Sequence, residues 1–286
     1  MSLPAPILVT GATGNLGRAA LHSLATLGIP ARAGVRDLSQ RPGHDAVVLD
    51  FERPETFAPS VVGVGGLVLV RPPPIADVGP TLCALVDAAM AAGVRRVVFL
   101  SVIGADRRGY IPHAKVERHL RAAGADWTFL RAGFFAQNLG DAYRTDICER
   151  CELFVPAGDG RAAFVDVRDI GEVAARAFIE PGHVRVAHTL TGPEALTFTE
   201  VAALLTAALG REIRYTRPSV LAYVRRLRRR GLPWGQIAVQ SLLHVGLRFG
   251  QARNVDPTLH HLLGRPARTL VQYIADHRAL WSQQVP

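Results

Sequence analysis

The chain contains one lysine, Lys115, in the segment YIPHAKVERHL (110–120), although its 286 residues include 33 that are lysine or arginine. Lysine carries a compact ammonium whose pKa falls readily on burial, whereas arginine is a planar fork that stays protonated. All the remaining residues of this basic set are arginine. Lys115 is therefore a candidate for chemistry that arginine cannot perform. Chance retention of one lysine is the alternative.

Two neighbours of Lys115 also have side chains suited to proton transfer. His113 lies four residues before Glu117, so the two share one face of an expected helix over 112–124. His113 is a candidate proton donor, and a surface histidine paired with Glu117 is the alternative. Tyr110 precedes Pro112 and is expected in the loop ahead of the helix, from which it could swing toward a substrate.

A glycine-rich segment, VTGATGNLG, directly follows an expected strand over 7–10 and opens an expected helix over 15–28. Glycines at such a turn permit a tight bend, close approach to a pyrophosphate and close packing of helix on sheet. The helix N-terminus adds N–H groups and a positive dipole end. The segment therefore predicts a dinucleotide site. The residues expected to contact the dinucleotide are Gly11, Thr13, Gly14, Asn15, Leu16 and Gly17.

The end of the second expected strand selects the cofactor, because an acidic residue there suits NAD and an arginine suits a 2′-phosphate. This strand ends GVRD, with Arg36 before Asp37, which favours NADP(H). Asp50 and Phe51 follow the third expected strand, where an acceptor and an apolar wall would suit an adenine ring.

Short apolar strands alternate with helices in the first half, which predicts a parallel sheet covered on both faces. The expected strands are 7–10, 31–35, 46–49, 67–70, 96–101 and 127–133. We expect an α/β protein with a Rossmann-type doubly wound sheet and a smaller, mostly helical C-terminal substrate lobe. Residues 1–133 would form the NADP-binding domain, and residues 134–286 would complete the sheet and form the lobe.

The chain leaves the sixth expected strand as AGFFAQNL, at the sheet edge where ligands usually bind. Phe134, Phe135 and Asn138 are therefore candidate substrate contacts, with core packing as the alternative for the two aromatics. Trp234 in the helical lobe is a weaker candidate.

The formal net charge is +9 and the sequence pI is near 10.4. Apart from RRLRRR (225–230), the arginines are scattered, so a solvated basic surface is favoured over a polyanion site. That segment has no sustained apolar face and no helix-turn-helix pattern. We expect neither a nucleic-acid nor a membrane partner, and a monomer or homodimer.

The N-terminus has no basic region of a signal peptide, so a cytoplasmic protein is expected. Cys148 and Cys151 form a lone C-x-x-C without a second ligand pair. Two reduced thiols are therefore favoured over a metal site.

Several segments, in this order, resemble the NmrA-like family, an atypical branch of the short-chain dehydrogenases: ILVTGATGNLG, GVRD, VVLDFERPETF, HAKVERHLRAAGADWTFLRAGFFAQNL and FVDVRDIGEVAARAF. The resemblance implies a Rossmann fold, NADP(H), and either reductase activity or redox sensing without turnover. It also implies that Lys115 lies near the nicotinamide ribose. Ordinary short-chain dehydrogenases use Tyr-x-x-x-Lys, but Ile111 stands four residues before Lys115. Ser101 resembles the position of their catalytic serine.

The sequence thus predicts an NADPH-dependent reductase that transfers hydride to a flat conjugated acceptor of the quinone, enone or iminium type. A non-catalytic NADP(H)-binding regulator is the alternative, favoured by the missing tyrosine.

Overall fold

The computed structural model describes residues 5–40 and 45–282, which fold into two compact units. The first unit contains residues 1–132, 167–190 and 261–263. The second contains residues 133–166, 191–260 and 264–286. The chain therefore leaves the first unit after the sixth strand and returns to it twice, over 167–190 and over 261–263.

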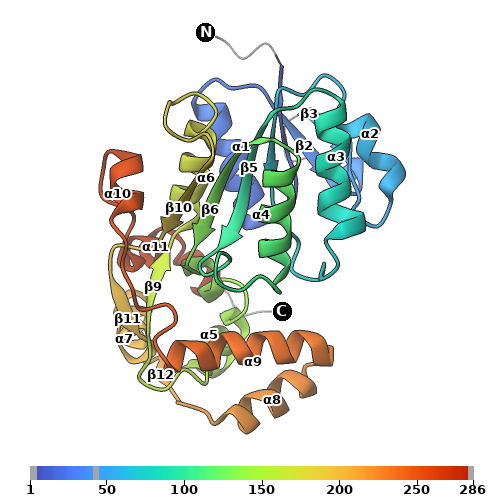
Figure 1. The fold of residues 1–286 in the computed structure, drawn as a ribbon. Coiled ribbons are helices and arrows are strands. Elements are labelled where there is room, and N and C mark those ends of the chain that lie inside the picture. The colour runs from blue at the N-terminus through green and yellow to red at the C-terminus, as the bar shows by residue number, and fades with distance from the viewer. Residues whose placement is uncertain (1–4, 41–44, 283–286) are drawn as a thin grey trace. The chain divides into compact units, whose positions relative to one another are not determined.

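A seven-stranded parallel sheet forms the centre of the first unit (Figure 1), with strand order β10-β6-β5-β4-β1-β2-β3. The strands are β1 Ile7–Val9, β2 Ala31–Val35, β3 Asp45–Val48, β4 Gly66–Leu69, β5 Arg96–Val102, β6 Asp126–Ala132 and β10 Val186–Leu190. All neighbouring pairs are parallel. The predicted Rossmann-type sheet is confirmed, and β10 adds the seventh strand from the second half of the chain.

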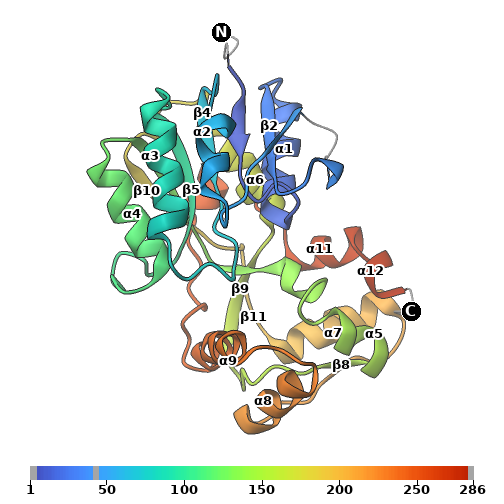
Figure 2. The same cartoon turned by 90° about the vertical axis from the view of Figure 1, so that its right-hand side faces the viewer.

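Helices cover both faces of this sheet (Figures 1 and 2). They are α1 Asn15–Thr26, α2 Phe57–Ser60, α3 Ala84–Ala91, α4 Pro112–Ala122 and α6 Val167–Arg176. One apolar core cluster lies between the sheet and α2, α3 and α4, and another lies on the side of α1. Gly171 of α6 packs closely on α1, because a Cβ there would lie 2.6 Å from the backbone of Ala19.

A π-helical turn, Gly79–Cys83, directly precedes α3. Two shorter 3-10 turns, Leu38–Gln40 and Pro54–Thr56, follow β2 and precede α2. These turns lie in the connections that follow β2, β3 and β4.

The second unit is less purely helical than the sequence predicts, because it holds a three-stranded sheet, β11-β9-β7, and a two-stranded sheet, β12-β8. Its strands are β7 Phe134–Phe135, β8 Glu152–Leu153, β9 Arg161–Val165, β11 Ala195–Thr197 and β12 Arg214–Tyr215. A 3-10 turn lies at Ala136–Leu139. The last residues of α10 belong to the first unit. The helices are α5 Arg144–Arg150, α7 Phe198–Leu209, α8 Val220–Arg229, α9 Trp234–Arg248, α10 Thr258–Leu263, α11 Leu270–Asp276 and α12 Ala279–Ser282.

A capping box starts α7, where the hydroxyl of Thr197 accepts a hydrogen bond from the backbone N–H of Glu200 and the Glu200 carboxylate accepts one from the Thr197 N–H. The ring of Phe198, the residue after Thr197, is fully buried in the core of this unit.

Candidate cofactor and active site

The glycine loop adopts the tight turn that a phosphate-binding loop needs. Gly11 has φ +61°, a conformation that favours glycine. A Cβ on Gly17 would lie 2.1 Å from the Gly11 carbonyl oxygen, so the helix could not approach the turn with any larger residue there. Gly14 is the N-cap of α1 and no side chain caps the helix, which leaves its N-terminus suited to an anionic group.

The other predicted loop contacts differ in how their side chains lie. Thr13, Gly14 and Asn15 are exposed, whereas the side chain of Leu16 is buried in the core beneath the loop. Leu16 can therefore contact a ligand only through its backbone.

The loop lies at the point where the strand order reverses, because β1 is flanked by β4 on one side and β2 on the other. The backbone N–H of Val70 donates to the hydroxyl of Thr10 at 2.8 Å, which ties the carboxyl ends of β4 and β1 together. Ligands of open α/β sheets bind in the crevice outside such a reversal. All the strands at this reversal point belong to the first unit.

Arg36 is exposed directly after β2 and has no ion pair with any other described residue. Asp37, by contrast, accepts hydrogen bonds from the backbone N–H and the hydroxyl of Ser39, at 2.9 and 2.7 Å. These hydrogen bonds lower the pKa of Asp37 and hold its carboxylate in the turn. Because Asp37 is engaged locally and Arg36 is not, this corner suits a 2′-phosphate better than a ribose hydroxyl pair.

Asp50 and Phe51 follow β3 as predicted, but their environments differ. Asp50 is partly exposed and accepts a hydrogen bond from the Glu52 N–H at 3.0 Å. Phe51 is buried, with its ring centre 6.2 Å from that of Phe57. The ring of Phe51 therefore belongs to the core under this edge and does not form an open wall, while an adenine contact for Asp50 stays a prediction.

His113 lies with Arg71 at the carboxyl ends of β4 and β5, beside the reversal point. The Nε of Arg71 donates to His113 Nε2 at 3.3 Å, and the ring of His113 lies 6.0 Å from that of Phe99. Burial and the positive charge of Arg71 lower the pKa of His113 to about 3. The ring is therefore neutral near pH 7, and because Nε2 accepts, its single proton is on Nδ1.

Arg71 also fixes the loop that follows β4. Its guanidinium donates to the backbone carbonyls of Pro72, Pro73 and Ile75, the last at 2.5 Å. The sequence analysis did not identify Arg71 as a site residue. The signal available was its position directly after the expected strand over 67–70, at the sheet edge where ligands usually bind.

Glu117 does not pair with His113, which excludes the alternative proposed for that histidine. Glu117 is almost fully buried, accepts a 2.6 Å hydrogen bond from the hydroxyl of Ser101, and pairs with both Nε and Nη2 of Arg131 at 3.0 and 2.7 Å. Arg121 adds a contact at 3.2 Å. Ser101 is fully buried, and its hydroxyl donates to Glu117, so it is not placed as the catalytic serine of ordinary short-chain dehydrogenases.

Removing the Glu117 charge should destabilise the protein. In Glu117→Gln, the largely buried guanidinium of Arg131 loses its two-point carboxylate partner, and the free energy of unfolding should fall by about 3 kcal/mol. Urea unfolding measures this change. Glu55→Gln, which breaks the exposed pair with Arg53, is the control and should leave the midpoint unchanged. Equal midpoints for the two variants would contradict a stabilising role for Glu117.

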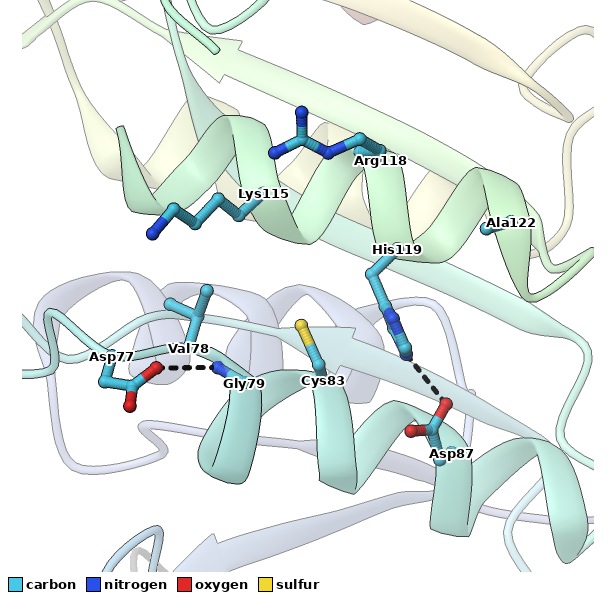
Figure 3. A pocket seen from close by; sticks show the side chains of 9 residues that line it. All are labelled: Asp77, Val78, Gly79, Cys83, Asp87, Lys115, Arg118, His119 and Ala122. Carbon is cyan, nitrogen blue, oxygen red and sulfur yellow. Dashed lines mark hydrogen bonds and ion pairs between the residues drawn. The ribbon is translucent and has the colours of Figure 1, made fainter. Parts of the chain in front are cut away.

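Lys115 is exposed on a different face of α4 from His113. It lines a groove of about 580 Å³ between α4 and the turn that leads into α3. Figure 3 shows its side chain extending over the groove, whose far wall carries Asp77, while His119 and Asp87 form an ion pair of 2.7 Å across it. Neither His113, Arg71 nor the glycine loop lines this groove.

Tyr110 lies in the loop before α4, as predicted, and is 78% exposed. The ribose-orienting role of Lys115 and the catalytic role of Tyr110 stay predictions. The structure places His113, and not these two residues, against the strand ends.

In the second unit, Phe134 and Phe135 form β7, and Asn138 lies in the 3-10 turn that follows. All three are half-buried. The ring of Phe134 lies within 6.3 Å of the rings of Phe164, Phe198 and His244, so at least part of it serves core packing. Trp234 starts α9, is 62% exposed and lies under the guanidinium of Arg228.

The three cysteines are free thiols, and burial raises the pKa of Cys83 to about 11. Among residues 5–40 and 45–282, no group of three or more His, Cys, Asp or Glu side chains is arranged to hold a metal ion. Within the same ranges, no helix has the length and apolar character needed to cross a membrane.

A sequence model of the NmrA-like family matches residues 5–275, nearly the whole chain. The chain belongs to the NmrA-like family. An NAD(P)H azoreductase from Xenophilus azovorans is 32% identical over 282 residues, which cover 96% of this chain and 98% of the azoreductase. Quinone oxidoreductase 2 of Escherichia coli is 29% identical, with 94% and 97% covered.

A solved structure supports the same placement. The crystal structure of an NADPH-dependent quinone oxidoreductase from Escherichia coli, complexed with NADPH, superposes with a TM-score of 0.83 at 28% identity, covering 94% of this chain and 99% of the other. The chain therefore has this fold.

Proposed function

We propose that this NmrA-like protein is an NADPH-dependent reductase that transfers hydride to a flat, conjugated small molecule of the quinone, enone or iminium type. The observation that carries the proposal is the convergence of the glycine loop, Arg36 and the Arg71–His113 pair on one carboxyl edge of the sheet. The azoreductase and quinone oxidoreductase names of its relatives support the same reaction class.

The residues present fit NADP(H). The turn at Gly11 and the uncapped start of α1 suit the pyrophosphate, and the missing space for a Cβ on Gly17 explains why glycine stands there. The exposed guanidinium of Arg36 would hold the 2′-phosphate. Thr13, Asn15 and Asp50 would supply polar contacts along the same crevice. When bound, the cofactor supplies the hydride.

His113 is the chain's own group best suited to polarise the acceptor. It is neutral, so it donates a hydrogen bond through Nδ1–H without carrying a charge that would have to be neutralised. Arg71 positions the ring by occupying Nε2 and at the same time fixes the loop after β4. Lys115, at the outer rim of the same helix, would contribute positive potential toward the ribose.

The substrate wall is proposed from the second unit. Phe134, Phe135 and Asn138, all half-buried, stay the candidate contacts for the acceptor. Trp234 is a weaker candidate, because its ring is engaged by Arg228.

The cofactor assignment predicts a selective loss of NADPH affinity in Arg36→Ala. A charge-assisted contact to a phosphate contributes about 1.5–3 kcal/mol, so NADPH binding should weaken roughly 10- to 100-fold. NADH binding should stay nearly unchanged, because NADH lacks the 2′-phosphate. Calorimetric titration of both nucleotides measures the difference. Wild-type protein that binds NADH as tightly as NADPH would show the assignment to be wrong.

Turnover distinguishes the reductase from a second candidate, a non-catalytic NADP(H)-binding regulator. The buried hydroxyl of Ser101 and the exposed loop position of Tyr110 favour this candidate, since neither residue is placed as an acid. Oxidation of NADPH should be followed with quinones, azo dyes, enones and iminium ions. We expect turnover with at least one class, and tight NADPH binding without turnover on any would favour the regulator.

The finer assignments belong to the same proposal. The partner is a small molecule and not a nucleic acid, and the protein works in the cytoplasm as a monomer or homodimer.

A further inference from the structure

The positive charge of this chain is concentrated in one segment. Residues 213–255 contain nine arginines and no aspartate, glutamate or lysine, which equals the formal net charge of +9 for the whole chain. The rest of the sequence is therefore neutral overall. A concentration of this kind indicates an anionic partner for the segment. A general preference for arginine over lysine would instead spread the positive charge along the whole chain.

The segment contains β12 and the helices α8 and α9, which lie side by side in the second unit (Figures 1 and 2). Arg214 pairs with Glu212, and Arg217 pairs with Asp159. Arg226 and Arg230 are neutralised there, because both pair with Asp146 and Arg226 also pairs with Glu152. Arg225 and Arg229 are exposed and have no ion pair with any described residue. Arg228 is also exposed and lies over the ring of Trp234.

α9 supplies an apolar face beside these arginines. Val239, Leu242 and Leu243 follow helical spacing and are each more than half exposed, with Leu242 at 73%. Trp234 at the start of α9 and Phe249 just after its end, 62% and 78% exposed, flank this stripe with aromatic rings. We call these five residues the α9 stripe. The opposite face of the helix, which carries His244, packs on the core.

An exposed apolar stripe on a helix without acidic residues is not explained by the folding of the unit. Contiguous exposed apolar surface marks an interaction site. Val239, Leu242 and Leu243 of the stripe are exposed, whereas Phe134, a predicted substrate contact, touches His244 on the buried side of α9. The stripe therefore needs an occupant other than the acceptor bound at the proposed substrate wall.

Arginines beside an apolar face with aromatic ends are the features of a helix that lies in a membrane interface. We propose that α8 and α9 dock the protein on an anionic lipid bilayer, with the α9 stripe in the acyl boundary and Arg225, Arg228 and Arg229 at the phosphates. The sequence argued against a membrane partner because RRLRRR has no apolar face of its own; in the structure, the next helix supplies that face.

Two other occupants fit less well. A nucleic acid would neutralise the arginines but would leave five large apolar side chains in water. A second copy of the chain would cover the α9 stripe, but an isologous pairing brings two sets of unpaired arginines toward one another. An anionic bilayer satisfies both features at once. It would also give the proposed reductase access to acceptors that dissolve in lipid; that consequence rests on the proposed function, whereas the docking does not.

Sedimentation with vesicles tests the docking without any activity measurement. The full chain should bind vesicles of equal parts phosphatidylcholine and phosphatidylglycerol, and pure phosphatidylcholine vesicles far more weakly. Arg225→Gln with Arg229→Gln should weaken binding about 30-fold, because each arginine near an anionic surface contributes about 1 kcal/mol, or about fivefold. Leu242→Asn with Leu243→Asn should weaken it at least about tenfold.

Matched controls come from exposed residues of the first unit. Arg95→Gln and Val62→Asn remove an exposed arginine and an exposed apolar side chain there, and both should bind like the wild type. Thermal unfolding confirms that all variants fold. The proposal is overturned if the wild type binds neither vesicle at low salt, or if the controls weaken binding as much as the paired variants.

Two further results would also overturn it. One is a dimer in analytical ultracentrifugation that Leu242→Asn with Leu243→Asn dissociates, without vesicle binding. The other is binding to duplex DNA that the arginine variants abolish and the leucine variants leave intact, again without vesicle binding.

Discussion

His113→Phe should lower kcat at least about 100-fold and leave NADPH affinity near the wild-type value. The loss of one preorganised hydrogen-bond donor aimed at developing negative charge typically has an effect of this size. Phenylalanine keeps the aromatic shape beside Phe99 but removes Nδ1–H. Steady-state kinetics with the best acceptor, together with calorimetric NADPH titration, measures both quantities. Wild-type kcat in this variant would contradict the proposed role of His113.

The pH profile separates hydrogen-bond donation from proton transfer by an imidazolium. The pKa of His113 is about 3, so the ring is neutral throughout the usual assay range. The kcat of the wild type should therefore show no titration of this group between about pH 5 and pH 8. A titration near pH 6.5 that disappears in His113→Phe would mean that the ring acts as an imidazolium.

Lys115→Arg is the matched comparison on the same helix. Lys115 is the one lysine of the chain and matches the family pattern, and both facts predict that Lys115→Arg loses activity, because the shape of the cation changes. The structure leaves room for the larger guanidinium of arginine, since Lys115 is exposed over a groove that His113 and Arg71 do not line. We expect a small effect. A large loss in Lys115→Arg beside normal turnover in His113→Phe would return the catalytic role to the lysine.

The sheet was predictable because its strands are short apolar runs buried on both faces, and burial of this kind leaves little freedom of register. β2 has the predicted bounds, and β6 begins one residue earlier than expected. The small sheets of the second unit were harder. β7 and β8 have two residues each, too few to show a pattern, and they form because distant segments such as β9 and β12 pair with them.

The candidate site was also predictable from the sequence only in part. The glycine loop and Arg36 were found because their roles depend on local spacing along the chain. His113 was found as a candidate, but its partner was misassigned: Glu117 shares its helix face, yet Arg131 from β6 and Ser101 from β5 occupy that carboxylate. Side chains that meet across strands cannot be paired by spacing within one helix. The α9 stripe was missed because the arginine segment and its apolar face are on consecutive helices.

Acidification from pH 6.5 to pH 5 should destabilise the protein steeply, before most carboxylates titrate. Burial lowers the pKa of His113 to about 3 and that of His244 to about 4. In the unfolded chain both titrate near 6.5. Their contribution to stability is therefore complete above that unfolded pKa and is lost as the pH falls toward the folded pKa, because only the unfolded state takes up the protons.

Near pH 5 these two histidines together should reduce the free energy of unfolding by about 2–3 kcal/mol per pH unit. His188, with a pKa of about 4, acts in the same direction but is more exposed. Urea unfolding across this pH range measures the slope. His113→Phe removes one titrating group. It should reduce the dependence of the unfolding free energy on pH by the contribution of about one proton. His22→Gln replaces an exposed histidine and is the control, which should keep the wild-type slope. Identical slopes for wild type and His113→Phe would mean that His113 is not held neutral by the fold, and would also remove the basis for its proposed role as a neutral donor.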